Sequence, residues 1–242
     1  MKALSLSMLL VLFTLPLMAQ ETMAVKQHKN QVNLELTDLP TAFFSFGYER
    51  VIGKHISVDL GIGFKSKDGL IKLSGIDTDK IKTNEITYSG YKLIPEFKYY
   101  LNESINGAML SGFYFGAYLK YSDFKSDLEG TYIDSGDVSH LFTYKGDITV
   151  TSLGLMVGYK LPVAKRFYID FLIAGPGTGS YDFKLKNIIP PPDEFYDDLN
   201  EALNQYSVLD IINADFKFRD NKLRSKFNAL SFRYGISLGY SF

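Results

Sequence analysis

Large apolar side chains alternate with small or polar side chains at the end of the chain. Between positions 230 and 242, even positions hold Leu, Phe, Tyr and Ile, whereas odd positions hold Ser, Gly and one Arg. This period of two predicts a strand longer than the usual length of about five or six residues. A bulky face opposite a crowded face of Gly and Ser is typical of a strand between hydrocarbon and a narrow barrel lumen.

The same alternation recurs in seven earlier segments, and each predicts a strand. They are 32–37, 42–49, 56–65, 91–101, 112–121, 152–160 and 167–174. Short connections alternate with long polar ones at 66–85, 123–145 and 184–224, as periplasmic turns alternate with outer loops. We therefore predict an all-β fold, an eight-stranded antiparallel transmembrane β-barrel with long outer loops and both ends on the periplasmic side.

The first nineteen residues have the order of parts found in a secretory signal. Lys2 precedes an apolar run from Ala3 to Leu15, and a small residue, Ala19, follows. We expect cleavage after Ala19, because the run is too short for a spanning helix of about 20 residues. Residues 20–242 are then one outer-membrane β-barrel domain, and the cell outer membrane is the expected location.

Composition narrows the choice of function. The chain has 17 Tyr, 19 Phe and 20 Gly, a mixture that suits strands and membrane interfaces. Zero cysteines exclude a disulfide framework, a thiolate metal site and a cysteine nucleophile. A formal net charge of −1 gives no reason to propose nucleic acid as a partner.

Charged residues gather on the face predicted to line the lumen. An eight-stranded barrel is just wide enough for side chains to fill it, so buried charges there must pair. We expect a salt-bridged network that closes the lumen, and a polar pathway for ions or a small solute is the alternative. The network comprises Glu35, Glu49, Asp59, Lys65, Lys92, Glu96, Lys98, Lys120, Lys160, Asp170 and Arg233.

Pro95 interrupts the alternation of the segment 91–101. Proline cannot donate a hydrogen bond to the ladder, so we expect a β-bulge at this position.

The connection 184–224 carries the most distinctive pattern. After Pro190–Pro192, acids at 193 and 194 open an amphipathic segment of about four turns. We expect either a lid on the barrel rim or a surface that binds a protein or glycan partner. Its acidic polar face disfavours anchoring to anionic lipid. The apolar residues assigned to this loop interaction surface are Phe195, Tyr196, Leu199, Leu203 and Tyr206.

The three histidines are scattered: His28 precedes the first strand, His55 lies at a periplasmic turn and His140 lies in an outer loop. We therefore expect no metal site and no cofactor. His140 lies near Asp134, Ser135, Asp137 and Ser139, which a lipid hydrolase of the outer rim would need. The same residues are common in solvated turns, so we expect no catalytic residues and no enzyme.

Several strand sequences resemble small barrel proteins of Bacteroidota. They are Tyr48-Glu49-Arg50, the segment 56–64, the segment 94–101 and the segment 112–118. They are similar to domain-of-unknown-function families grouped with OmpA-like and porin-like outer-membrane barrels. That resemblance implies a location and a fold, and no catalytic residue. Tyr240 and Phe242 resemble the terminal signal that the barrel-assembly machinery recognises.

These patterns favour a non-enzymatic outer-membrane protein with a structural or surface-interaction role and a closed lumen. Its expected partners are outer-membrane lipid, the barrel-assembly machinery and a surface protein or glycan that contacts the outer loops. A narrow pore is the main alternative, and an outer-membrane lipid hydrolase is a lesser one. A soluble secreted barrel that binds an apolar ligand is the remaining alternative.

Overall fold

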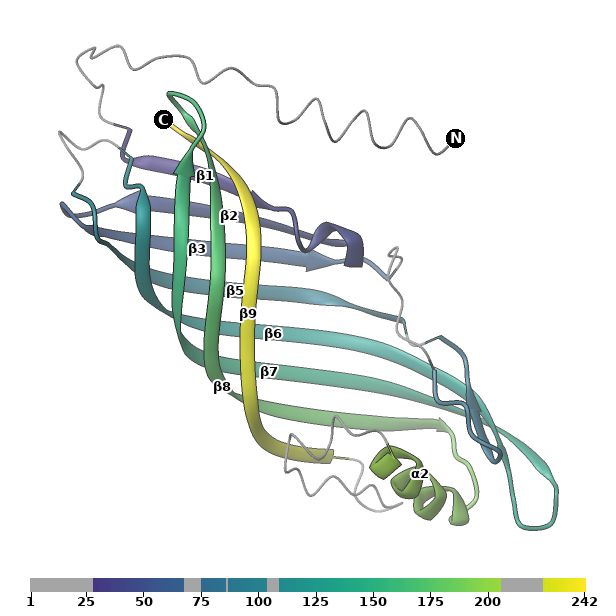
Figure 1. Cartoon of the computed structure of the whole chain (residues 1–242). Coiled ribbons are helices and arrows are strands. Elements are labelled where there is room, and N and C mark those ends of the chain that lie inside the picture. The colour runs from purple at the N-terminus through teal and green to yellow at the C-terminus, as the bar shows by residue number, and fades with distance from the viewer. Residues whose placement is uncertain (1–27, 68–74, 86, 104–108, 206–223) are drawn as a thin grey trace, which may run out of the picture.

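The computed structural model describes residues 28–67, 75–85, 87–103, 109–205 and 224–242, so the predicted signal peptide lies outside the described residues. Within those ranges the chain is almost entirely β-structure, with one short 3-10 helix and one α-helix (Figure 1). No helix in the described ranges is long and apolar enough to cross a membrane. The elements are β1 (Asn30–Glu35), η1 (Leu39–Thr41), β2 (Phe43–Val51), β3 (Ile56–Lys65), β4 (Ile81–Thr83), β5 (Thr87–Tyr100), β6 (Gly112–Ile133), β7 (Ser139–Pro162), β8 (Phe167–Ile189), α2 (Glu194–Gln205) and β9 (Arg224–Ser241).

The long strands close into a ring. Antiparallel neighbours follow the order β6, β5, β3, β2, β1, β9, β8 and β7, and β7 pairs with β6. The last strand closes the barrel by pairing with the first, for example Gln31 with Ser241. The predicted all-β barrel of eight antiparallel strands is therefore confirmed. The short β4, which the alternation did not predict, adds only to the far end of β6, where Ile81 pairs with Tyr132.

The barrel has two ends. The base holds Asn30 and Phe242, joined by backbone hydrogen bonds, and the outer end holds α2 (Figure 1). Near the base the predicted facing is confirmed: Phe232 and Tyr234 are 62% and 72% exposed, whereas Ser237 is buried. Because the large apolar side chains point outward and not into a core, the wall suits contact with hydrocarbon.

Glycines make room for rings inside this narrow tube. A Cβ atom built on Gly239 would lie 2.0 Å from Cζ of Tyr168, and one on Gly158 would lie 2.2 Å from Cζ of Tyr114. Both tyrosines are almost fully buried. The crowded face of Gly and Ser seen in the sequence therefore reflects lumen side chains that arrive from neighbouring strands.

The segment 123–145 corrects the sequence analysis, which treated it as a long outer loop. It forms the outer halves of β6 and β7, joined by a turn at 134–138, with continuous pairing up to Ile133 and Ser139. The strand β8 likewise continues to Ile189, and β9 begins at Arg224, so both strands run into the predicted loop 184–224. Half of the wall thus rises beyond the ends of β1, β2 and β3.

A change of polarity explains this error. On the outward face of β6, Tyr121 is the last residue of the apolar run. The outward positions above it are Asp123, Lys125, Asp127 and Glu129. The inward positions become apolar at the same height, since Tyr132 belongs to a hydrophobic cluster and Leu128 packs against it. The period of two persists while the two faces exchange character, which is expected where a strand leaves hydrocarbon and enters water.

The bulge predicted at Pro95 is wrong. Leu93 pairs with Tyr121 and Glu96 pairs with Tyr118, so the register of β5 against β6 is the same on both sides of the proline. The missing N–H interrupts the ladder without adding a residue to it. Register shifts occur instead between β7 and β8, at Val157/Gly158 and Thr143/Tyr144, and between β8 and β9, at Leu172/Gly175.

Candidate functional site

The predicted lumen charges lie on the inner wall at three heights. Glu49, Asp59, Lys98, Lys160 and Asp170 are buried near the base. Glu96 and Arg233 lie above them, and Glu35, Lys92 and Lys120 line a cavity at greater height. Lys65 is buried near the outer end of β3, where its ammonium lies 4.7 Å from the ring centre of Tyr88. The structure therefore brings most of these residues into one column, and Lys65 stands apart from it.

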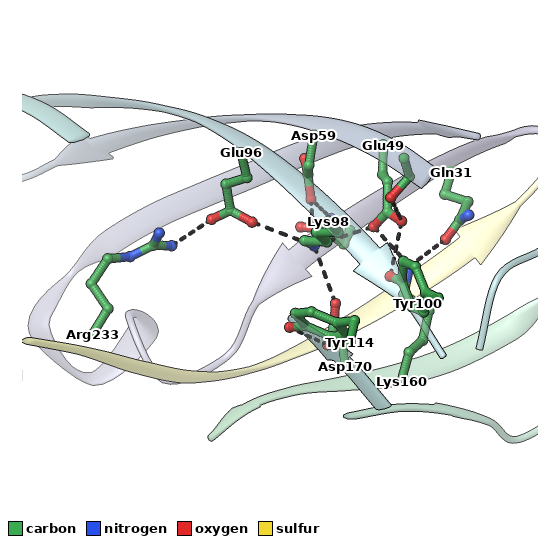
Figure 2. Close-up of polar contacts among 12 residues, drawn as sticks. Gln31, Glu49, Asp59, Glu96, Lys98, Tyr100, Tyr114, Lys160, Asp170 and Arg233 are labelled. Carbon is green, nitrogen blue, oxygen red and sulfur yellow. Dashed lines mark hydrogen bonds and ion pairs between the residues drawn. The ribbon is translucent and has the colours of Figure 1, made fainter. Parts of the chain in front are cut away.

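Lys98 is the centre of the network near the base. Its Nζ atom lies 3.2 Å from Glu49, 3.0 Å from Asp59, 3.4 Å from Glu96 and 3.4 Å from Asp170 (Figure 2). Three of these carboxylates come from the neighbouring strands β2, β3 and β5, the last of which carries Lys98 itself, and Asp170 comes from β8 across the ring. One ammonium thus joins the β2, β3 and β5 side of the wall to β8, and its removal would leave several buried carboxylates without their shared cation.

Lys160 forms a second contact across the base. Its fully buried Nζ atom donates to Oε1 of Gln31 at 2.8 Å and to Oε2 of Glu49 at 2.7 Å. Ser57 and Tyr100 donate to the other oxygen of Glu49, at 2.7 and 3.0 Å. Every oxygen of this carboxylate therefore has a partner, as a buried charge requires.

Tyrosine rings fill the space that the charges leave. Tyr100 and Tyr168 flank the ammonium of Lys160, with ring centres at 5.2 and 4.6 Å. Tyr114 donates a hydrogen bond of 2.9 Å to Asp170. Together with the ion pairs, these rings occupy the lumen near the base.

A cavity of about 310 Å³ lies in the lumen above Lys98. It is lined by Asp38, Lys92, Lys120 and Arg233, and Lys98 and Asp170 of the network near the base also line it. Arg233 pairs with Glu96 at 2.7 Å, and its guanidinium lies over the ring of Tyr118 at 4.6 Å.

Asp38 is a lumen residue that the sequence analysis missed. It pairs with the ammonium of Lys92 and accepts a hydrogen bond of 2.5 Å from Ser45. Asp38 lies in the connection between the predicted strands 32–37 and 42–49, and the structure places that connection over the lumen. The sequence signal for Asp38 was an acidic residue in a short connection, at the same level of the barrel as the lumen residue Lys92.

A second core lies at the outer end, between α2 and the inner face of the raised wall. We call it the lid core: Ile76, Ile81, Tyr132, Phe142, Tyr144, Phe195, Tyr196, Leu199 and Ala202. Phe195 lies at its centre, with its ring 4.7 Å from that of Phe142 and 5.4 Å from that of Tyr132. Tyr144 donates a hydrogen bond of 3.0 Å to the hydroxyl of Tyr196.

These contacts favour the lid interpretation of the amphipathic segment. Phe195, Tyr196 and Leu199 are buried against the wall, so the apolar face of α2 is not offered to a partner in this structure. The side chain of Leu203, and Tyr206 altogether, lie outside the described residues. The helix is a lid, and its outward face is polar, with Asp197 and Glu201 exposed.

Asp198 fastens the lid to the wall. It accepts hydrogen bonds from Tyr132 at 2.7 Å and from Lys80 at 2.9 Å. Partial burial opposes its ionisation, but the hydrogen bonds and the charge of Lys80 outweigh that effect and hold the pKa of Asp198 below its usual value.

The predicted hydrolase residues at the β6–β7 turn have structural partners. His140 contacts Asp134 at 2.8 Å, and this hydrogen bond, helped by the backbone N–H groups of Val138 and Gly136, lowers the pKa of Asp134. The hydroxyl of Ser135 donates to Glu194 of α2 at 3.0 Å. The serine thus joins the turn to the lid. In the described residues no group of three His, Asp or Glu side chains is placed to hold a metal ion.

The terminal residues predicted as an assembly signal lie at the base. Tyr240 accepts a hydrogen bond of 2.6 Å from Arg166, and its ring contacts that of Phe167. Phe242 is 47% exposed. Recognition of this end by the barrel-assembly machinery stays a prediction.

Comparisons with known proteins identify a family but no activity. Residues 6–187 match a family model described as a protein of unknown function, DUF3575. No curated protein matches the sequence. Among solved structures, the chain is similar to the outer membrane protease OmpT from Escherichia coli, at 10% identity and a TM-score of 0.28, over 88% of this chain and 92% of that one. A likeness at that level says nothing about catalysis here.

Proposed function

The chain belongs to the DUF3575 family of proteins of unknown function, and from that premise we propose that it is a non-conducting barrel of the outer membrane with a structural or surface-interaction role. The base of the lumen would be held shut by its ion pairs. The raised wall and its lid would be the part that meets other molecules at the cell surface.

The contacts of Lys98 carry the proposal of a closed lumen. Four carboxylates within 3.4 Å of one buried ammonium leave no path through this level without breaking several charge-assisted hydrogen bonds. Opening it would separate buried carboxylates from the cations that pair with them, so a closed resting state is favoured.

The surface role is supported by the shape of the outer end. The raised wall of β6, β7 and β8 and the docked α2 form a rigid platform, on which exposed acids at 193, 194, 197 and 201 face outward. Rigid scaffolds that hold long connections commonly carry recognition. A surface protein or glycan with basic or hydroxyl groups fits this face.

A narrow conduit is the second candidate, and the cavity above the base favours it. About 310 Å³ of polar space, from Lys120 down to Lys98, could hold a small solute, and a movement of the tyrosines below Lys98 would extend it through the base. The expectation that the protein is not an enzyme stays a prediction, and so does the lesser alternative that it is a lipid hydrolase. Loss of lipid modification in His140→Ala would support the hydrolase.

Planar-bilayer conductance tests the closed lumen. We expect no sustained openings from the wild-type protein and measurable openings from Tyr100→Ala combined with Tyr114→Ala, which removes two rings at the base. Tyr121→Ala, which trims a ring on the outward face, is the matched control and should stay silent. Sustained openings of the wild-type protein would favour the conduit instead.

Membrane fractionation tests the location. The protein should follow the outer membrane and should migrate differently in heated and unheated gel samples, as a detergent-resistant barrel does. Recovery in the soluble fraction without detergent would contradict the proposal.

A further inference from the structure

Two charged residues that line the lumen cavity have no ion partner. In the part of the chain that the structure describes, Lys120 forms no ion pair and no hydrogen bond. Glu35 accepts a hydrogen bond from the hydroxyl of Thr37, but within the same described ranges it forms no ion pair. The other charged residues of the lining all belong to ion pairs: Asp38, Asp59, Lys92, Glu96, Lys98, Asp170 and Arg233.

These two residues stand on opposite walls of the barrel. Lys120 belongs to β6 and Glu35 to β1. In the ring of strands, β1 is the fourth neighbour of β6 whichever way the ring is followed. One cation and one anion therefore lie on opposite sides of the same cavity and do not meet.

The strand register supplies no partner for Lys120. Its cross-strand neighbour on β7 is Ser152. The strand on its other side, β5, carries a single acid, Glu96. The two oxygens of Glu96 already contact Lys98, at 3.4 Å, and Arg233, at 2.7 Å (Figure 2). Cross-strand pairing, which usually explains charges on a sheet, does not account for this lysine.

The other charges nearby do not compensate either residue. Lys92 and Arg233 act on Lys120 more strongly than Asp38 does. Around Glu35 the order is similar, since the like charge of Asp38 acts more strongly than the opposite charge of Lys92. Both side chains are half-buried, so each loses part of its hydration and meets mainly charge of its own sign. A ligand that brings both charges would compensate both.

The size and the position of the cavity suit a small polar solute. Its volume of about 310 Å³ is at the lower end of the range for ligand pockets, roughly 300–1,000 Å³. Asp38 and Thr41 of the connection between β1 and β2 line it, so it lies beside the low side of the wall. A solute from the outer end would reach it without crossing the network near the base. The lining also holds two buried polar atoms without a hydrogen-bond partner, Nη1 of Arg233 and Oδ1 of Asp59.

We propose that the lumen cavity binds a small zwitterion, with its carboxylate at Lys120 and its ammonium at Glu35. Each end of such a solute meets a charge that the barrel leaves uncompensated, and the ligand adds no net charge to the lumen. A simple anion or cation would serve one wall and leave the other without a partner. The proposal rests on the cavity that the proposed barrel encloses, and it holds whether or not the base conducts.

Calorimetric titration of the full-length barrel in detergent tests the proposal. The probes are glycine, β-alanine, γ-aminobutyrate and ε-aminocaproate, whose two charges lie progressively further apart. The references are the carboxylate and the amine of matching length. We expect the best zwitterion to bind at least about tenfold more tightly than either reference, because each end adds a hydrogen bond between charged groups.

Single substitutions assign the two ends of the ligand. K120M should lower the affinity for the zwitterion to that of the matching amine, and E35Q should lower it to that of the matching carboxylate. K125M and E129Q, on the outward face of β6, are the controls and should keep the wild-type affinity. K120E should abolish binding and K120E/E35K should restore it, since the exchanged charges accept the ligand in the reverse orientation.

Three results would overturn the proposal. They are a wild-type protein that binds no member of the series, equal affinity for a zwitterion and its reference ions, and unchanged affinity in K120M and E35Q. The heat-modifiable band shows that each variant is folded. Conductance of the same samples tests the closed lumen separately, so failure of one proposal is distinguished from failure of the other.

Discussion

The two cores of this barrel are built from the same strands and from opposite chemistry. Near the base, β5, β7 and β8 direct Lys98, Lys160 and Asp170 inward, and ion pairs fill the lumen. At the outer end, β6 and β7 direct Tyr132 and Phe142 inward, and rings cover the inner face of α2. The buried charges of the inner wall therefore lie where the outer wall is apolar, with Ile94 and Met156 packed among the tyrosines there, and the lid core lies where the outer wall is charged.

The difference follows from what lies outside the wall. Within the bilayer, hydrocarbon takes up apolar side chains on the outward face, so a strand needs no apolar interior. Above the bilayer the outward face meets water, and the strands must bury apolar area against something else, which the lid provides. Stability at the base then depends on charge balance, whereas stability at the lid depends on packing.

The largest effect is expected from Lys98→Met, which removes the cation shared by four buried carboxylates. Breaking one buried ion pair costs about 3–5 kcal/mol, and this change breaks several. We expect the variant to lose the heat-modifiable band of the folded barrel. Lys54→Met at an exposed turn is the control, and an unchanged band in Lys98→Met would show that the base does not depend on its charges.

A smaller and more local effect is expected from Phe195→Ala at the centre of the lid core. Emptying a buried phenylalanine site costs about 3–5 kcal/mol, but here the cost falls on docking of α2 and not on the ring of strands. Limited proteolysis should cut α2 faster while the heat-modifiable band persists. Asp197→Ala on the exposed face of α2 should change neither, and joint loss of lid and barrel would mean that the two cores are not separable.

Tyr196→Phe should weaken the lid by about 1 kcal/mol, because Tyr144 and Asn187 lose the hydroxyl that contacts them. Hydrogen exchange of α2 measures the effect. Exchange as fast as in Phe195→Ala would mean that the hydroxyl, and not packing, dominates the lid.

The smallest effect is a pH dependence of the lid. The pKa of Asp198 is held below its usual value, near 4, in the folded protein. Its stabilising contribution is therefore complete above about pH 4 and is lost as the pH falls through the folded pKa. Hydrogen exchange of α2 should accelerate below pH 4 in the wild-type protein. Asp198→Asn should exchange faster at pH 7 and respond less to acid, and an equal response in both would exclude Asp198 as the cause.

Much of this architecture can be inferred from alternation alone. The period of two between 230 and 242 identifies the strand and tells which side chains face outward, because side chains on a strand must alternate. The same rule placed Glu49, Lys98 and Lys160 on the inner wall. The helical spacing of Phe195, Tyr196 and Leu199 likewise identified an apolar face before any packing was known.

Tertiary structure decided the rest. That Glu49, Asp59 and Asp170 share Lys98 depends on the register of strands far apart in the sequence, which a local pattern does not contain. On β6 the apolar side chains change from the outward to the inward face, which hid the outer half of the strand from the sequence pattern. An inward Tyr132 is explained only by the lid that covers it. Asp38 faces the lumen only because closure of the ring brings its turn over Lys92. Alternation is a property of one strand, whereas charge pairing and burial are properties of the closed barrel.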